Sequence, residues 1–177
     1  MHVTTKKIAT AGLLVAFSVF MMLLSSVIET SSLFFIAAAS FSVGIAVREW
    51  GIRFGFAFFV AAVALNFLLT PNKLYCFTFA GMQFYIWASE LLWRKIVDAK
   101  NLRGRTILLW TGKYMIFNLL YVPALFFAPQ VLFTGKINGL AAIILLIAGQ
   151  AICYIYDMAY RYFQSQIWGR LRKKLFE

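Results

Sequence analysis

Residues 8–28 read IATAGLLVAFSVFMMLLSSVI and contain no charged side chain. At about 1.5 Å per residue, a helix of this length crosses the ~30 Å hydrocarbon core of a bilayer. Lys6 and Lys7 precede the stretch, as basic residues precede the apolar region of a signal peptide. The apolar stretch is too long for a signal peptide, however, and LLSSV (23–27) is a poor cleavage site. We therefore predict that this segment is a membrane-spanning helix that stays in the protein.

Further apolar segments of similar length follow along the chain. The second is short and rich in Ala, Ser and Gly, so we expect it to pack between other helices and not to face lipid all round. Pro123 near the end of the fifth predicts a kink or an early stop. The sequence thus predicts a single all-α domain over residues 1–177, a bundle of six transmembrane helices at about 8–28, 32–47, 53–70, 74–93, 106–127 and 139–160.

The composition supports a membrane protein. Hydrophobic residues make up 63% of the 177 residues and charged residues only 13%, and the mean hydropathy is +0.82. A soluble domain of this size needs more charge to cover its surface. Aromatic residues reach 18%, which suits a lipid-facing surface with rings near its interfaces.

The basic residues predict the orientation in the membrane. With the N-terminus inside, only Lys73 and Lys136 fall in outer loops, and Lys113 falls within a helix. The other fourteen basic residues fall on the inner side: Lys6, Lys7, Arg48, Arg53, Arg94, Lys95, Lys100, Arg103, Arg105, Arg161, Arg170, Arg172, Lys173 and Lys174. Such a bias indicates that both termini are cytoplasmic in a multi-pass protein of the cell membrane.

The net charge of +11 needs no nucleic-acid partner, because anionic lipid attracts basic residues on the inner side. Residues 161–177 mix apolar and basic side chains, so we expect this tail to lie on the inner membrane surface. Docking of a cytoplasmic partner on the tail is the alternative.

The sequence carries no enzyme signature that we recognise. It has no paired carboxylates, no metal-ligand cluster, no Ser/His/Asp set and no glycine-rich phosphate loop. Cys76 and Cys153 lie far apart in apolar segments, as core cysteines do. We expect no catalysis, no cofactor and no metal.

Polar residues recur at helical spacing in the fourth, fifth and sixth segments, where exposure to hydrocarbon would be costly. Three amides fall near the same depth, with aromatic residues next to them along the same helix faces. They predict a pocket for a small polar, ring-containing ligand. Interhelical hydrogen bonding is the alternative role for each of them. The candidate substrate-binding residues are Gln83, Trp87, Tyr114, Asn118, Gln150 and Tyr154.

Lys113 lies about 10 Å from the inner face if its segment is helical. A buried ammonium needs a partner, and Glu90 or Asp157 can supply one from about one turn inside the membrane. Asp157 and Arg161 are four residues apart and can also pair on their own helix. We expect a structural ion pair, with gating or substrate contact as the alternatives.

The chain resembles the substrate-binding S components of energy-coupling factor (ECF) transporters. The resemblance covers nearly the whole chain: its size, its six segments, its orientation and the stretch KIATAGLLVA (7–16). In that family, two small residues four apart on the first helix contact the coupling subunit, and the matching positions here are Gly12 and Ala16. The resemblance implies uptake of a vitamin-like molecule, driven by a coupling subunit and ATPases on other polypeptides.

Two other functions remain open at the level of sequence. One is a membrane scaffold similar in size to the rod-shape protein family MreD. The other is an autonomous small transporter.

Overall fold

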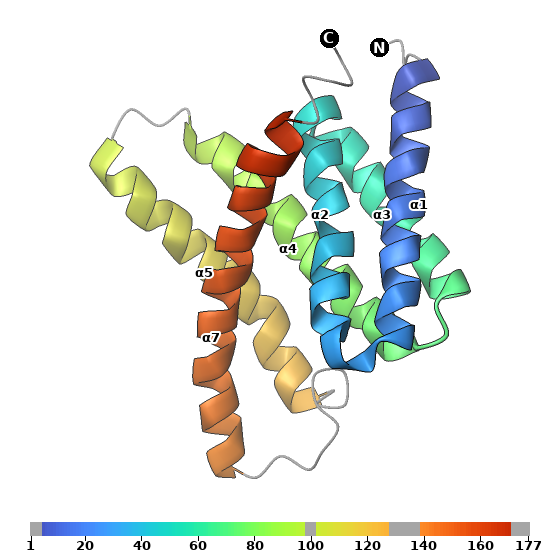
Figure 1. Ribbon diagram of the computed structural model, residues 1–177. Coiled ribbons are helices and arrows are strands. Elements are labelled where there is room, and N and C mark those ends of the chain that lie inside the picture. Colours follow the sequence, from blue (N-terminus) through green and yellow to red (C-terminus); the bar gives the residue numbers. More distant parts are fainter. Residues whose placement is uncertain (1–4, 98–101, 128–138, 171–177) are drawn as a thin grey trace.

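The computed structural model describes residues 5–97, 102–127 and 139–170, and within these ranges the chain is helical apart from short connections. Six long helices account for most of the described residues (Figure 1), and their ends lie within a few residues of the predicted ones. The elements are α1 (Thr5–Val27), a 3-10 turn η1 (Glu29–Ser31), α2 (Ser32–Trp50), α3 (Ile52–Leu69), α4 (Lys73–Val97), α5 (Leu102–Phe127), α7 (Gly139–Tyr162) and a π-helix η2 (Phe163–Trp168).

Local backbone chemistry explains where the first helices end. Gly51 separates α2 from α3 and has φ of 96°, a conformation that residues with a Cβ rarely adopt. Its N–H donates to Val47 O at 2.9 Å, which closes the last turn of α2. Thr70 closes α3 in the same way on Asn66 O, and Pro71 follows. In α5, by contrast, the helix continues through Pro123 to Phe127, so the proline does not stop it early.

Helix α2 lies at the centre of the molecule, packed against α1, α3 and α4. Every residue from Ala39 to Val47 is buried. The small side chains in this run let the neighbouring helices approach closely, as the composition of the segment predicts. Met22, Phe79 and Ile86 are fully buried around it and complete the apolar core.

Three helices are long and apolar enough to cross a membrane within the described residues: Lys7–Val27, Glu29–Trp50 and Ile52–Leu69. Their outward faces carry large apolar side chains, such as Leu13 at 68% exposure and Leu68 at 76%. Apolar side chains exposed on such helices suit contact with lipid. These features indicate a membrane protein.

Helices α5 and α7 lie together on one side of the molecule, and α1 and α3 lie on the other (Figure 1). Helix α5 packs against α4 and α7. Tyr156 of α7 reaches α2, where its hydroxyl lies 2.6 Å from Ser40 Oγ. The pair α5 and α7 is therefore attached to the α1–α4 group through both α4 and α2.

The first part of the predicted surface tail continues α7 as η2. Within it, Gln164 and Trp168 are buried, and Trp168 Nε1 donates to Glu49 Oε1 at 3.0 Å. The tail therefore docks on the end of α2 through Trp168, while Ile167 is exposed. Residues 171–177 lie outside the described residues.

Candidate functional site

Helices α5 and α7 face each other through polar and aromatic side chains. On α5, Trp110, Tyr114 and Asn118 are four residues apart, so they share one face of the helix. On α7, Gln150 and Tyr154 have the same spacing. We call these five residues the α5/α7 seam. All but Tyr154 are half-buried, and Tyr154 is 42% exposed.

The two amides of the seam bond to each other. Gln150 Nε2 donates to Asn118 Oδ1 at 2.8 Å, and Asn118 Nδ2 donates back to Gln150 Oε1 at 3.2 Å. Asn118 Nδ2 also donates to Tyr114 O at 2.9 Å, within its own helix. The reciprocal pair fixes the side chains in orientation and ties α5 to α7 at this depth.

Aromatic rings continue the seam toward the end of α7 that leads into η2. The Trp110 and Tyr154 rings stack, with centroids 5.3 Å apart and planes at 25°. The Tyr114 ring also contacts Trp110, with ring centroids 5.9 Å apart and planes at 33°. These rings offer flat apolar surfaces next to the amide pair, an arrangement suited to a ring-containing ligand.

The other two predicted site residues lie elsewhere. Gln83 is fully buried between α4 and α2, and its Nε2 lies 3.4 Å from Ser42 Oγ. Trp87 Nε1 donates to Ile52 O of α3 at 3.2 Å, and its ring packs against Phe56. The structure thus brings four of the six predicted residues together and places Gln83 and Trp87 against α2 and α3.

Next to the seam, the half-buried Lys113 is paired. Lys113 Nζ donates to Asp157 Oδ1 at 2.5 Å, and the Asp157 side chain is 1% exposed. Arg161 Nε lies 3.1 Å from Asp157 Oδ2, in the four-residue spacing noted in the sequence. Both cations also lie over the Trp110 ring, at 5.7 Å and 5.2 Å from its centroid.

Glu90, the alternative partner for Lys113, belongs to a second ion pair. Its Oε1 accepts from Arg48 at 2.6 Å and from the Tyr160 hydroxyl at 2.7 Å. Sequence reasoning missed Arg48 and Tyr160, because Arg48 was placed beyond the end of the second helix. The helix instead continues to Trp50, and Glu90 compensates the charge. We call Arg48, Glu90 and Tyr160 the Glu90 cluster, which joins α2, α4 and α7.

Gly12 and Ala16 are exposed on α1. A Cβ added at Gly12 would meet no heavy atom within 4 Å. At Gly12, α1 therefore leaves open space toward the other described helices, and Ala16 lies exposed one turn further on. An exposed pair of this kind leaves room for close approach by another helix.

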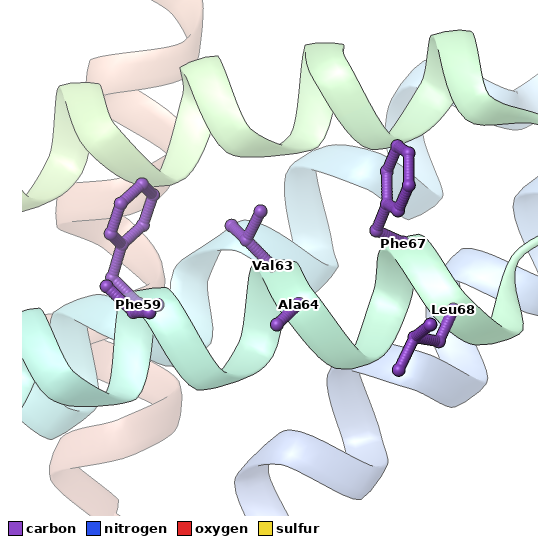
Figure 2. A pocket seen from close by; sticks show the side chains of 6 residues that line it. Phe59, Val63, Ala64, Phe67 and Leu68 are labelled. Carbon is purple, nitrogen blue, oxygen red and sulfur yellow. The ribbon is translucent and has the colours of Figure 1, made fainter.

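An apolar groove on the outer face of α3 was not anticipated from the sequence. The rings of Phe59 and Phe67 stand at its two ends, with Val63 between them, as Figure 2 shows. The complete lining is Phe59, Val60, Val63, Ala64, Phe67 and Leu68. Phe59, Val63 and Phe67 have the spacing i, i+4, i+8, which could have indicated the groove from the sequence, although many membrane helices carry the same spacing.

Comparison of the chain with protein-family models, with curated proteins and with solved structures gives no match. The functional proposal therefore depends on the residues of the seam and on the resemblance noted above.

Proposed function

We propose that this chain is the substrate-binding membrane subunit of an ATP-driven uptake transporter, and that it holds a small, vitamin-like molecule at the α5/α7 seam. The observation that carries the proposal is the reciprocal Asn118–Gln150 amide pair, flanked by the stacked Trp110 and Tyr154 rings. Amides and rings at one place between two membrane helices are the features expected of a site for a polar ring compound.

The hydrogen-bonding capacity of the amide pair supports ligand binding. Each amide has two N–H donors and a carbonyl oxygen with two lone pairs. Among the described residues, the Gln150 amide nitrogen uses one donor and each amide oxygen uses one lone pair. One donor and two acceptor sites remain for a bound molecule. Such a molecule would sit beside the aromatic rings and bond to a pre-oriented pair.

The proposed subunit crosses the cell membrane six times, with both termini in the cytoplasm. The unequal distribution of basic residues supports this orientation. The α4, α5 and α7 helices would complete the six spans, with their polar faces turned toward one another. Asp157 and Glu90 support this arrangement, because both carboxylates are buried and paired with cations.

Uptake would require two kinds of protein partner, each a separate polypeptide. A coupling subunit would pack against the exposed Gly12 and Ala16 of α1, where small side chains permit close contact between helices. ATPases would bind the coupling subunit on the cytoplasmic side and supply the energy for release of the substrate.

Purification of the full chain from its native membrane in mild detergent tests the proposal. Co-purification of a membrane subunit and ATPases in fixed ratio would support it. As a matched control, Leu13→Trp changes another exposed position of α1 and should leave the co-purification of the partners unchanged. Recovery of the chain alone, or with enzymes of cell-wall synthesis, would contradict the assignment to an uptake system.

A membrane scaffold is the second candidate, because polar bonds join α7 to its neighbours. The two amides of the seam bond to each other, the Lys113–Asp157 ion pair joins α5 to α7, and the Tyr160 hydroxyl of α7 donates to Glu90 of α4. Such bonds stabilise a bundle whether or not a ligand binds. The same purification separates the two functions, since a scaffold would bring down protein partners without a stoichiometric small molecule.

A further inference from the structure

The apolar groove on α3 opens on a helix that is long and apolar enough to cross a membrane. Small side chains at Val63 and Ala64 form its floor, and the rings of Phe59 and Phe67 stand at its two ends (Figure 2). Leu68 and Val60 along its side are 76% and 50% exposed. The groove therefore opens toward the hydrocarbon of the bilayer on the side of Val60 and Leu68, while its Phe59 and Phe67 rings also contact Phe84 and Phe77 of α4.

The groove has the length of one leaflet. Phe59 and Leu68 are nine residues apart, so the groove runs for about 13 Å along the helix axis. Half of a ~30 Å hydrocarbon core is about 15 Å. A hydrocarbon chain that lies in the groove would thus be held along most of its leaflet.

A cation, Lys73, lies at one end of the groove. Lys73 Nζ lies 4.9 Å from the centroid of the Phe67 ring and donates to Phe67 O and to Thr70 O. Lys73 is exposed, and none of the ion pairs found among the described residues includes it. An ammonium has three N–H donors, so one remains for an anion. In the orientation proposed above Lys73 faces the outer leaflet, where its ammonium can form a charge-assisted hydrogen bond with the phosphate of an anionic lipid headgroup.

We propose that this groove is a binding site for an anionic phospholipid, whose acyl chain lies against Val63 and Ala64 between the two phenylalanine rings and whose phosphate pairs with Lys73. The site requires only that α3 spans the membrane, so it is independent of the proposed transport function. It is also separate from the α5/α7 seam, since all its residues belong to α3 and the start of α4.

Photo-crosslinking tests the site. The full chain is reconstituted in phosphatidylcholine vesicles that contain a small fraction of phosphatidylglycerol with a diazirine in the middle of one acyl chain. Adducts are mapped by mass spectrometry of peptides. We expect adducts to concentrate on residues 59–68, well above their density on the exposed face of α1. The same probe with a phosphatidylcholine headgroup should label residues 59–68 less.

Two variants separate the headgroup contact from the groove itself. Lys73→Gln should lower phosphatidylglycerol adducts on residues 59–68 about fivefold, the equivalent of about 1 kcal/mol for one cation near the membrane surface. The matched control Arg53→Gln removes an exposed cation at the other end of α3 and should leave them unchanged. Ala64→Trp fills the groove and should remove the adducts, whereas Leu13→Trp on α1 should not.

Three results would overturn the site. Equal adduct density on α1 and on residues 59–68 would mean that bulk lipid covers both faces alike. Unchanged labelling in Lys73→Gln, or equal labelling by the two headgroups, would remove the anionic lipid. Protection of residues 59–68 from every lipid probe would show that a protein helix occupies the groove.

Discussion

At the scale of single residues, Asp157 shows how buried charge is accommodated in this chain. Its side chain is 1% exposed and contacts two cations of unequal exposure: the Lys113 side chain is 14% exposed and that of Arg161 is 49% exposed. Exposed pairs contribute little to stability because water screens them. Loss of one partner from a buried pair is costly, because the remaining charge is left without compensation. We therefore expect Lys113–Asp157, and not Arg161–Asp157, to be the ion pair whose loss lowers the stability of the protein most.

We predict that Asp157→Asn destabilises the ligand-free protein by about 3–5 kcal/mol, since it leaves the Lys113 ammonium unpaired. Arg161→Gln should cost less than about 1 kcal/mol. Unfolding in detergent, followed by circular dichroism, measures both. The double substitution Lys113→Met, Asp157→Leu should recover much of the loss. If the double variant is as unstable as Asp157→Asn, the ion pair is not the source of the effect.

At the scale of helices, close packing between α2 and α7 depends on Gly44. A Cβ at this position would overlap the hydroxyl and ring of Tyr160. Tyr160 in turn donates its hydroxyl proton to Glu90 at 2.7 Å. The absence of a side chain at Gly44 thus lets α7 come close enough to complete the Glu90 cluster.

We predict that Gly44→Ala destabilises the protein by about 1–3 kcal/mol, the usual cost of overpacking. Gly12→Ala is the matched control, because a Cβ there meets nothing within 4 Å. Alanine in an exposed helix position should be neutral or stabilising by up to about 1 kcal/mol. Thermal unfolding measures the stability of both variants. Equal changes in stability would contradict the close approach of α2 and α7.

A further prediction at this scale concerns the exposed small residues of α1. Replacement of both Gly12 and Ala16 by Leu should abolish assembly with the proposed coupling subunit, because the larger side chains keep the two helices apart. The isolated protein should stay folded, since both positions are exposed. Size-exclusion chromatography of the complex and of the isolated chain gives both readouts. Intact assembly would remove the role of this face in coupling.

The sequence allowed the number and positions of the helices to be predicted, because apolar length and basic flanks determine them. Helix ends were harder to predict where charged residues lie inside a helix: α2 includes Arg48 because Glu90 compensates it. The sequence also allowed us to predict which polar residues share one face of α5 and of α7, since this follows from helical spacing. Which helices become neighbours was not, and Gln83 therefore fell beside Ser42 and not at the seam.

At the scale of the whole molecule, the orientation in the membrane can be tested by labelling. In a background where Cys76 and Cys153 are replaced by Ala, we predict that Asn72→Cys reacts with a membrane-impermeant maleimide added to intact cells. Lys95→Cys should react only after the cells are opened, because the bias of basic residues places it inside. Labelling of Asn72→Cys from the cytoplasmic side alone would contradict the orientation.

The most direct test of the central claim is mass spectrometry of the small molecules that co-purify with the chain. We expect one polar, ring-containing compound in stoichiometric amount with the unmodified protein. Asn118→Ala or Gln150→Ala should weaken its binding by about 5- to 150-fold, the equivalent of the 1–3 kcal/mol lost when a buried hydrogen-bond partner is removed. Gln83→Leu should retain the compound, because Gln83 contacts Ser42 and not the seam. The absence of any enriched compound, or its full retention by both seam variants, would contradict the proposed site.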